Sequence, residues 1–175
     1  RPAGVTFTYN GNGTATFAGT PAPATGGVYP LTLTATNGLG APAVQNFTFV
    51  VDQPPDAVSD SYANGVGNTQ YVVGAAPPGT PAVVVTGTVI GNDIGTSLPL
   101  TAGPAVIAST QGGQVVMSAN GAFIYTPPVG FTGPSDTFTY TLTDAQARTD
   151  TAVVTINLSG LVWYVRQSAT NGDGR

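Results

Sequence analysis

Residues 136–144 read Asp-Thr-Phe-Thr-Tyr-Thr-Leu-Thr-Asp, and this stretch decides the fold class. Phe138, Tyr140 and Leu142 alternate with threonines, so an extended chain places an apolar face opposite a threonine face. Threonine is β-branched and favours strands. The same period-two pattern recurs in residues 29–36 and 151–158. The sequence therefore predicts an all-β protein whose antiparallel sheets have one wet face.

Turn signals divide the chain into strands and blocks. Asn-Gly pairs between alternating segments indicate hairpins and occur at residues 10–11, 12–13, 37–38 and 120–121. Pro54 and Pro55 mark a boundary, because proline cannot donate to a strand ladder and restricts the residue before it. The expected strands are residues 5–9, 14–19, 28–36, 44–51, 57–63, 69–74, 83–90, 98–108, 114–118, 121–126, 136–143 and 150–158. No helix longer than one turn is expected.

The blocks differ in completeness. We expect a partial sandwich domain in residues 1–52, a complete sandwich domain in residues 53–159, and a C-terminal strand and loop in residues 160–175. The four strands of the first block make at most half of a seven-stranded sandwich. One sheet alone would expose its apolar face, formed by Phe7, Phe17, Leu33 and Phe49. Strands that precede Arg1 in a longer polypeptide, or strands of another chain, would have to cover that face.

The composition excludes most catalytic chemistry. All 8 acidic residues are Asp, and all 4 basic residues are Arg. Glu, Lys, His and Cys are absent. Without His or Cys there is no Ser-His-Asp or Cys-His nucleophilic site and no zinc or haem ligation through those residues. Without Lys there is no Schiff base and no P-loop lysine. We predict that the chain is not an enzyme.

The charge balance limits the partners. The net charge is −4, and four scattered arginines cannot form the basic stripe that nucleic acids or anionic membrane surfaces require. The longest apolar run, residues 161–165, is far shorter than the roughly 18 residues of a membrane span, and no signal peptide is expected at residue 1. We therefore predict no nucleic-acid binding and no membrane span in this chain.

Two stretches resemble repeats of bacterial surface proteins. Residues 2–51 resemble the C-terminal part of immunoglobulin-like domains that occur in tandem, and residues 54–158 resemble the cadherin-like, or tandem-95, repeats of giant adhesins. The first resemblance rests on residues 2–7, 13–21, 27–37 and 47–51. The second rests on residues 57–62, 89–93, 121–127, 130–133, 136–144 and 151–156. A short match at residues 162–165 and 171–175 is similar to the opening of a parallel β-helix domain.

These resemblances imply tandem antiparallel β-sandwich domains of immunoglobulin-like and cadherin-like type in a bacterial, extracellular or cell-surface protein. The function they imply is structural or adhesive: a stalk repeat, an adhesin with a cell-surface or matrix ligand, or a self-assembling filament subunit. Two alternatives stay open. One is a calcium-dependent carbohydrate- or receptor-binding module, and the other is a noncatalytic accessory domain of a secreted hydrolase.

Calcium is the one metal that the resemblance suggests, because such repeats often use it to stiffen domain junctions. The available oxygen donors are Asp56, Asp60, Asp93, Asp144 and Asp150. The acidic run that usually follows Asn-Asp in the family is missing, since Asp93 is followed by Ile-Gly-Thr. Acidic loop residues also serve as solvated turn caps. We expect no cofactor, with calcium at these residues as the alternative.

Two further hypotheses concern carboxylate catalysis and assembly. A hydrolytic pair could be drawn from Asp136 with Asp144 or Asp150, but their spacing along one hairpin does not force the carboxylates together.

A five-residue segment that is apolar on both faces could be donated to the open first block of another copy, which gives head-to-tail assembly. It could instead form a buried local strand, begin a β-helix, or present aromatic rings to a sugar. This predicted interface consists of Leu161, Val162, Trp163, Tyr164 and Val165.

Overall fold

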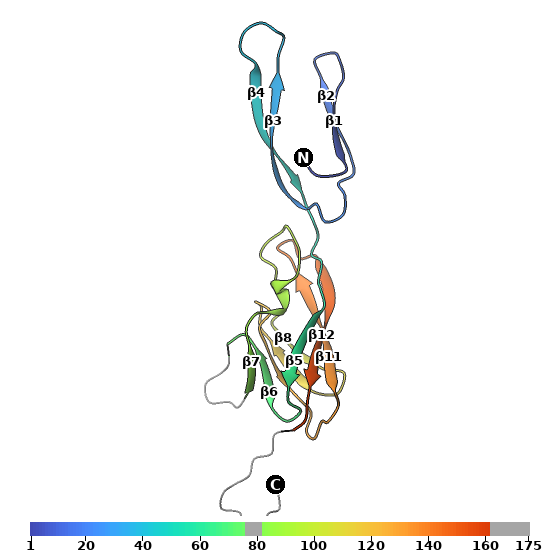
Figure 1. Ribbon diagram of the computed structural model, residues 1–175, viewed down its shortest axis with the longest axis vertical. Helices are drawn as coiled ribbons and strands as arrows, with labels where there is room; N and C mark the ends of the chain where they lie inside the picture. The colour runs from blue at the N-terminus through green and yellow to red at the C-terminus, as the bar shows by residue number, and fades with distance from the viewer. Residues whose placement is uncertain (76–81, 162–175) are drawn as a thin grey trace, which may run out of the picture. The chain divides into compact units, whose positions relative to one another are not determined.

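The computed structural model describes residues 1–75 and 82–161, and strands make up nearly all of the regular structure there (Figure 1). Within those residues the one helical element is a single 3-10 turn, Val89–Gly91. The predicted all-β fold class is confirmed. The chain divides into unit 1, which is Arg1–Pro54 with Gly95–Ser97, and unit 2, which is Pro55–Ile94 with Leu98–Arg175.

Unit 1 consists of two β-hairpins. Strands β1 (Val5–Tyr9) and β2 (Ala15–Gly19) form one antiparallel pair, and β3 (Gly27–Ala35) and β4 (Ala43–Val51) form the other. The strand segments agree closely with those expected from the alternating pattern. In the described residues each of these strands pairs with a single neighbour, so unit 1 holds two separate two-stranded sheets. The loop Gly95–Ser97 joins this unit through Thr96, whose hydroxyl accepts a 2.7 Å hydrogen bond from the Gln53 amide.

Unit 2 is a sandwich of two sheets. A five-stranded sheet has the order β7-β6-β10-β9-β8, and a three-stranded sheet has the order β11-β12-β5. The strands are β5 (Asp60–Gly65), β6 (Gln70–Val73), β7 (Ala82–Val85), β8 (Ala105–Ala108), β9 (Gln114–Met117), β10 (Phe123–Thr126), β11 (Ser135–Thr143) and β12 (Thr149–Leu158).

The core of unit 2 lies between its sheets, and the alternating residues fill it. Phe138, Tyr140 and Leu142 of β11 are buried, as are alternate residues of β12 from Ala152 to Leu158. They face Tyr71, Val73, Val115, Met117, Phe123 and Tyr125 of the larger sheet. The Asn120-Gly121 turn that joins β9 to β10 forms as predicted, with Gly121 at a φ of 80° that glycine adopts without strain.

The chain passes through unit 2 from one end of β12 to the other. Just after the entry at Pro55, the amide of Ala57 donates a 2.8 Å hydrogen bond to Asp150, near the start of β12. Beyond the other end of β12, the carbonyl of Gly160 accepts a 3.1 Å hydrogen bond from the Gly67 amide. The ten residues of β12 separate these two points, a length of about 33 Å at 3.3 Å per residue.

Three details differ from the expectation. Residues 98–108 do not form one strand: the chain makes an isolated bridge at Thr101 and begins β8 only at Ala105, after Pro104, which has no amide to donate. The segment expected as residues 83–90 leaves the sheet after Val85 and turns at Val89. Two of the sheet pairings, β5 with β12 and β6 with β7, are parallel, whereas the others are antiparallel.

Candidate functional site

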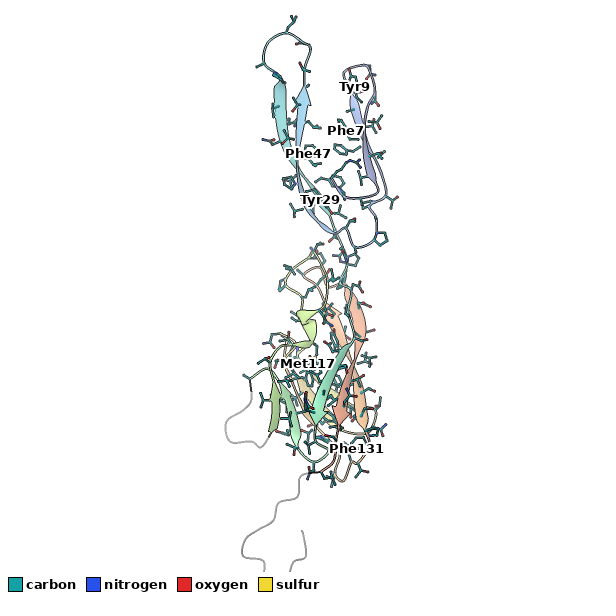
Figure 2. The ribbon with its side chains drawn as sticks, in the orientation of Figure 1. Phe7, Tyr9, Tyr29, Phe47, Met117 and Phe131 are labelled. Atoms are coloured by element: carbon teal, nitrogen blue, oxygen red, sulfur yellow. The ribbon has the colours of Figure 1, made fainter. Side chains whose placement is uncertain are left out.

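Unit 1 gathers four phenylalanines in one cluster, which we call the aromatic layer: Phe7, Phe17, Phe47 and Phe49. The ring of Phe17 lies 5.1 Å from that of Phe7, 5.7 Å from that of Phe47 and 6.3 Å from that of Phe49. Figure 2 shows Phe7 and Phe47 projecting from the two hairpins toward each other. Such offset and edge-on pairs are favourable beyond the area they bury.

The aromatic layer is not sealed from solvent. Phe7 is 44% exposed, and the other three rings are half-buried. Within residues 1–54 only Pro2 and Val5 are fully buried. Leu33, which the sequence placed on the same face, is also half-buried. The two hairpins of unit 1 therefore cover their common apolar face only in part.

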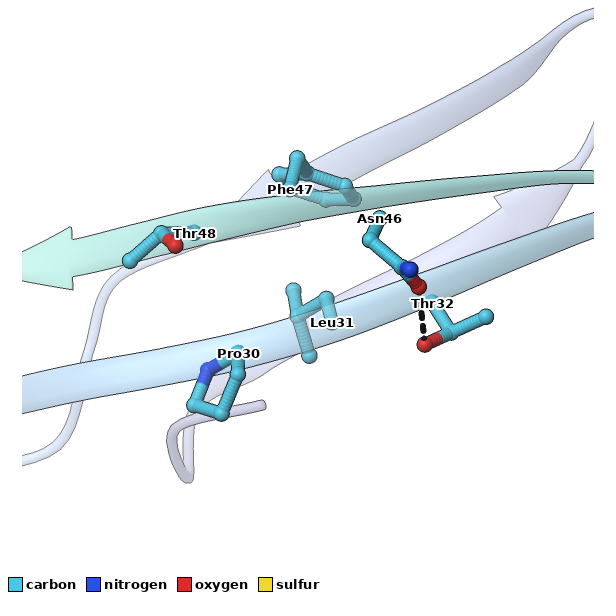
Figure 3. A pocket seen from close by; sticks show the side chains of 6 residues that line it. All are labelled: Pro30, Leu31, Thr32, Asn46, Phe47 and Thr48. Atoms are coloured by element: carbon cyan, nitrogen blue, oxygen red, sulfur yellow. Dashed lines mark hydrogen bonds between the residues drawn. The ribbon is translucent and has the colours of Figure 1, made fainter.

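A shallow hollow of about 210 Å³ lies on the β3–β4 ribbon (Figure 3). Its six lining residues are three cross-strand pairs, namely Pro30 with Thr48, Leu31 with Phe47, and Thr32 with Asn46. The hydroxyl of Thr32 donates a 2.7 Å hydrogen bond to the side-chain oxygen of Asn46. No titratable side chain lines this hollow, so it offers weak polar contacts and no acid, base or nucleophile.

Asp93 is the centre of the acidic region predicted for calcium. It lies just after the 3-10 turn, and its Oδ1 accepts a 2.8 Å hydrogen bond from the Val58 amide. The buried Tyr140 hydroxyl contacts both carboxylate oxygens, at 2.8 and 2.9 Å. Burial raises the pKa of Asp93 despite these two hydrogen bonds, and the negative charges of Asp150 and Asp56 raise it further. The carboxylate is thus held by protein donors on the sandwich itself.

Asp60 begins β5 and is coupled to Asp93. Burial, followed by the negative charge of Asp93, raises the pKa of Asp60 to about 6 against an opposing hydrogen bond from Asn92. The Oδ2 atom of Asp60 is buried and has no hydrogen-bond partner. An ionised Asp60 is therefore unfavourable in the folded unit, which has consequences for the pH dependence of stability.

The other predicted ligands are engaged separately. Asp144 caps the β11–β12 turn by accepting from the Gln146 and Arg148 amides and pairs with the Arg148 guanidinium at 2.7 Å. These contacts hold the pKa of Asp144 below its usual value although burial opposes them. The hydrogen bonds from the Ala57 and Thr151 amides lower the pKa of Asp150.

The backbone of Asp56 makes an isolated bridge to Ile94. Among residues 1–75 and 82–161, no three acidic side chains are grouped closely enough to hold a metal ion. A calcium site needs six to eight oxygen ligands around one point, and the expectation of no cofactor stays a prediction.

The most elaborate polar cluster centres on Asp136, which is 1% exposed. Its Oδ2 accepts hydrogen bonds from the Ser109 hydroxyl and, at 2.7 Å, from the Tyr125 hydroxyl. Its Oδ1 accepts from the Thr110 hydroxyl and from the Gln111 and Thr137 amides at 2.7–3.0 Å. Burial would raise the pKa of Asp136, but these hydrogen bonds together hold it below its usual value.

The Asp136 cluster is structural, because nothing about it exposes a reacting group. Asp150 on β12 lies opposite Leu142 on β11, and Leu142 comes six residues after Asp136. At 3.3–3.4 Å per residue, Asp150 is therefore about 20 Å from Asp136 along the strands. Paired carboxylates of glycoside hydrolases lie less than about 10 Å apart. Sequence reasoning weighed Asp136 as a catalytic partner and missed its place in the core. The signal that was missed is the two-residue alternation of the strand, which places Asp136 on the same buried face as Phe138 and Tyr140.

The predicted interface segment is described only at its first residue. Leu161 is half-buried, and its side chain lies beside Gly67, where a Cβ atom would come within 3.2 Å of it. Val162, Trp163, Tyr164 and Val165 lie outside the described residues, so the donor-strand hypothesis stays a prediction.

With the sandwich and its buried polar contacts described, the chain can be compared with known proteins. The family model for the bacterial Ig domain matches residues 52–157, which is well over half of the chain. The chain belongs to the bacterial Ig domain family. The match falls on the stretch that also resembles a cadherin-like repeat, and that finer resemblance stays a prediction. No curated protein and no solved structure matches the chain.

Bacterial Ig domains are noncatalytic and typically occur in surface proteins. In the part of the chain that the structure describes, no helix combines the length and the hydrophobicity needed to cross a bilayer. The bacterial Ig domain of this chain thus presents a sandwich with a sealed core. The hollow on the β3–β4 ribbon belongs to unit 1 and gathers no titratable group.

Proposed function

We propose that this protein is a noncatalytic structural and adhesive element of a bacterial surface or extracellular protein, in which the bacterial Ig domain acts as a stalk repeat. The observation that supports this role best is the path of the chain through unit 2. Unit 2 begins beside Asp150, and the chain that follows its last strand lies beside Gly67, at the opposite end of β12. Domains with this path can follow one another in series without rearrangement of their sheets.

The chemistry of the described side chains agrees with this role. The carboxylates of Asp93, Asp136 and Asp144 are taken up by internal hydrogen bonds, and the hollow on β3–β4 has no titratable lining. What the surface does offer is apolar contact area in the aromatic layer. Adhesion through this protein would therefore depend on burial and strand pairing more than on charge.

A domain-replacement experiment tests the stalk role. Residues 55–161 would be replaced, within the full-length gene, by an unrelated bacterial Ig domain of similar size, and surface display and adhesion of the bacteria would be measured. A spacer is interchangeable, so both should be retained. Loss of adhesion with normal surface display would contradict the spacer role and indicate a specific ligand site on unit 2.

A second candidate function is self-association through unit 1, and the open aromatic layer favours it. In the described residues each strand of unit 1 has one partner, which leaves unpaired N–H and C=O groups along its edges. The segment from Leu161 to Val165 is apolar on both faces and could complete such a sheet in a second copy. This donation would be head-to-tail and would propagate from copy to copy.

Light scattering across a concentration series tests self-association. The wild-type chain should form oligomers whose mass grows with concentration, and Trp163→Asp should abolish them. Val129→Asp, at a fully exposed apolar position of unit 2, is the matched control and should leave assembly unchanged. A wild-type chain that stays monomeric at all concentrations would contradict strand donation.

A further inference from the structure

The first and last strands of unit 2 lie side by side and run in the same direction. Strand β5 pairs in parallel with β12, with Val154 opposite Asp60, Ile156 opposite Tyr62, and Leu158 opposite Gly65 (Figure 1). In a hairpin-built sandwich a parallel pair can arise only between strands that are not joined by a short turn. Here it joins the strand that follows the entry point to the strand that precedes the exit point.

We propose that the β5–β12 pair is a mechanical clamp that lets unit 2 resist tension applied along the chain. The proposal rests on the stalk role above, because a repeat within a stalk is pulled through its two ends. Force at the entry side draws β5 toward its N-terminus, and force at the exit side draws β12 toward its C-terminus. The two strands are parallel, so these forces slide them past each other.

Sliding loads the connections between the strands together, whereas peeling breaks them one after another. Forced unfolding is governed by the unfolding rate, and simultaneous rupture of many bonds lowers that rate more than sequential rupture does. An antiparallel hairpin pulled at its open end would be peeled. The parallel register therefore determines how the same number of hydrogen bonds responds to force.

Contacts outside the regular ladder lengthen the clamp at the exit end. The Asn157 side-chain amide donates 3.1 Å hydrogen bonds to the Ser61 hydroxyl and to the Tyr62 carbonyl. The Ser159 amide donates to the Gly65 carbonyl at 2.8 Å, and the Gly67 amide donates to the Gly160 carbonyl at 3.1 Å. The two backbone bonds continue the connection past Leu158, the last paired residue of β12.

Contacts at the entry end and across the core anchor β5 itself. The Ala57 amide is bound to Asp150 before β5 begins. The Tyr62 ring packs 5.5 Å from Phe123 on the opposite sheet, and the Tyr71 hydroxyl donates a 2.7 Å hydrogen bond to the Ala63 carbonyl. Strand β5 therefore cannot leave β12 without also losing contacts to β6 and β10.

Single-molecule pulling in two directions tests the clamp. The sequence has no cysteine, so two introduced cysteines define the attachment points uniquely. Asp56→Cys with Ser159→Cys places β5 and β12 in shear. Thr132→Cys with Ser159→Cys places both attachments at the open end of the β11–β12 hairpin, where Ser135 pairs with Asn157, and peels it.

The shear pair should unfold at a mean force at least about double that of the peel pair, because only the shear pair loads the parallel ladder as a whole. Equal forces in the two directions would overturn the clamp. Such a result would leave the stalk role standing, since that role is tested separately by domain replacement in cells. Loss of function in the replacement experiment would likewise not alter the forces measured on the isolated chain.

A side-chain variant adds a second measurement. Asn157→Ala removes the two side-chain hydrogen bonds to β5 and should lower the shear force. Thr139→Ala, on the exposed face of β11, is the matched control and should leave the shear force unchanged. Equilibrium denaturation of both variants separates a loss of mechanical strength from a general loss of stability. An Asn157→Ala chain with unchanged shear force would overturn the assigned role of this side chain in the clamp.

Discussion

The Tyr125 hydroxyl donates a 2.7 Å hydrogen bond to the Asp136 carboxylate, and this bond joins the two sheets of unit 2 across the core. Tyr125 lies on β10 of the larger sheet, Asp136 lies at the start of β11 of the smaller one, and both side chains are buried. Ser109 and Thr110, from the turn between β8 and β9, complete the cluster. A single carboxylate thus fixes three chain segments.

Replacement of Asp136 should strongly destabilise unit 2. Asp136→Ala leaves five donors without their acceptor, two of them on buried side chains, and should lower the free energy of unfolding by about 3 kcal/mol or more. Asp136→Asn keeps one oxygen acceptor and should cost less. Urea denaturation followed by circular dichroism measures both. Asp56→Ala, at an exposed carboxylate, is the control and should stay near wild type. An Asp136→Ala chain as stable as the control would contradict the assigned role.

Asp60 should make unit 2 less stable as the pH rises from about 4 to about 6. Its pKa is raised to about 6 in the folded unit by burial and by Asp93, so the folded state binds a proton that the unfolded state has already released. The stability from that proton is fully present below the ordinary pKa near 4 and is lost as the pH passes through 6.

Asp60→Asn should remove this dependence. At pH 8 the free energy of unfolding of the variant should be about 1 kcal/mol higher than that of wild type, after allowance for solvent screening. Near pH 4 the two values should differ little. Denaturation at several pH values gives the wild-type-minus-variant difference directly. That difference also removes the opposite trends from Asp136, Asp144 and Asp150, whose lowered pKa values favour the fold above their ordinary pKa. A difference that does not change between pH 4 and 8 would argue against a raised pKa at Asp60.

Chelation should leave the thermal stability of unit 2 unchanged. Asp93, Asp144 and Asp150, which the sequence suggested for calcium, are bound by amides, a hydroxyl or Arg148, and no three acidic side chains among the described residues are grouped closely enough to hold a metal ion. Melting curves in EDTA and in millimolar calcium should therefore coincide. A site that binds calcium tightly adds stability by mass action, so a fall of more than about 10 °C in EDTA would show that calcium is bound after all.

Unit 1 should exchange its amide hydrogens faster than unit 2. Only two side chains are fully buried within residues 1–54, whereas β10, β11 and β12 each bury alternate residues in a closed core. Local opening is easiest where few apolar contacts are lost. Hydrogen exchange measured by mass spectrometry should show protection in β11 and β12 that exceeds that in β1 to β4. Equal protection of the two units in a monomeric sample would contradict the open aromatic layer.

The sequence was most informative where one rule governs a whole segment. The alternation through Phe138, Tyr140 and Leu142 predicted both the strand and the side that is buried, because a strand with one core face must alternate. Asn120-Gly121 predicted the β9–β10 turn for an equally local reason. The region of residues 98–108 was less predictable, since its apolar residues suggested a strand while Pro99 and Pro104 prevent a continuous ladder.

Long-range contacts set the limit of such prediction. Nothing local to β5 indicates that it pairs in parallel with β12, about ninety residues later in the chain. The Asp136 cluster likewise needs Ser109, Tyr125 and Asp136 to meet in space. The one local sign of this cluster was the position of Asp136 on the buried face of its strand. For calcium, the residue types were suggestive, but ligation depends on convergence around one point, which spacing along the chain does not supply.

The path of the chain through unit 2 also bears on how such a protein changes over time. A duplication of residues 55–161 inserts one more strand length, about 33 Å from the ten residues of β12, between whatever precedes and follows it. Recombination between neighbouring copies in a gene would then alter the reach of the product in fixed steps. The number of copies becomes the adjustable quantity, and each step reuses a fold that already works.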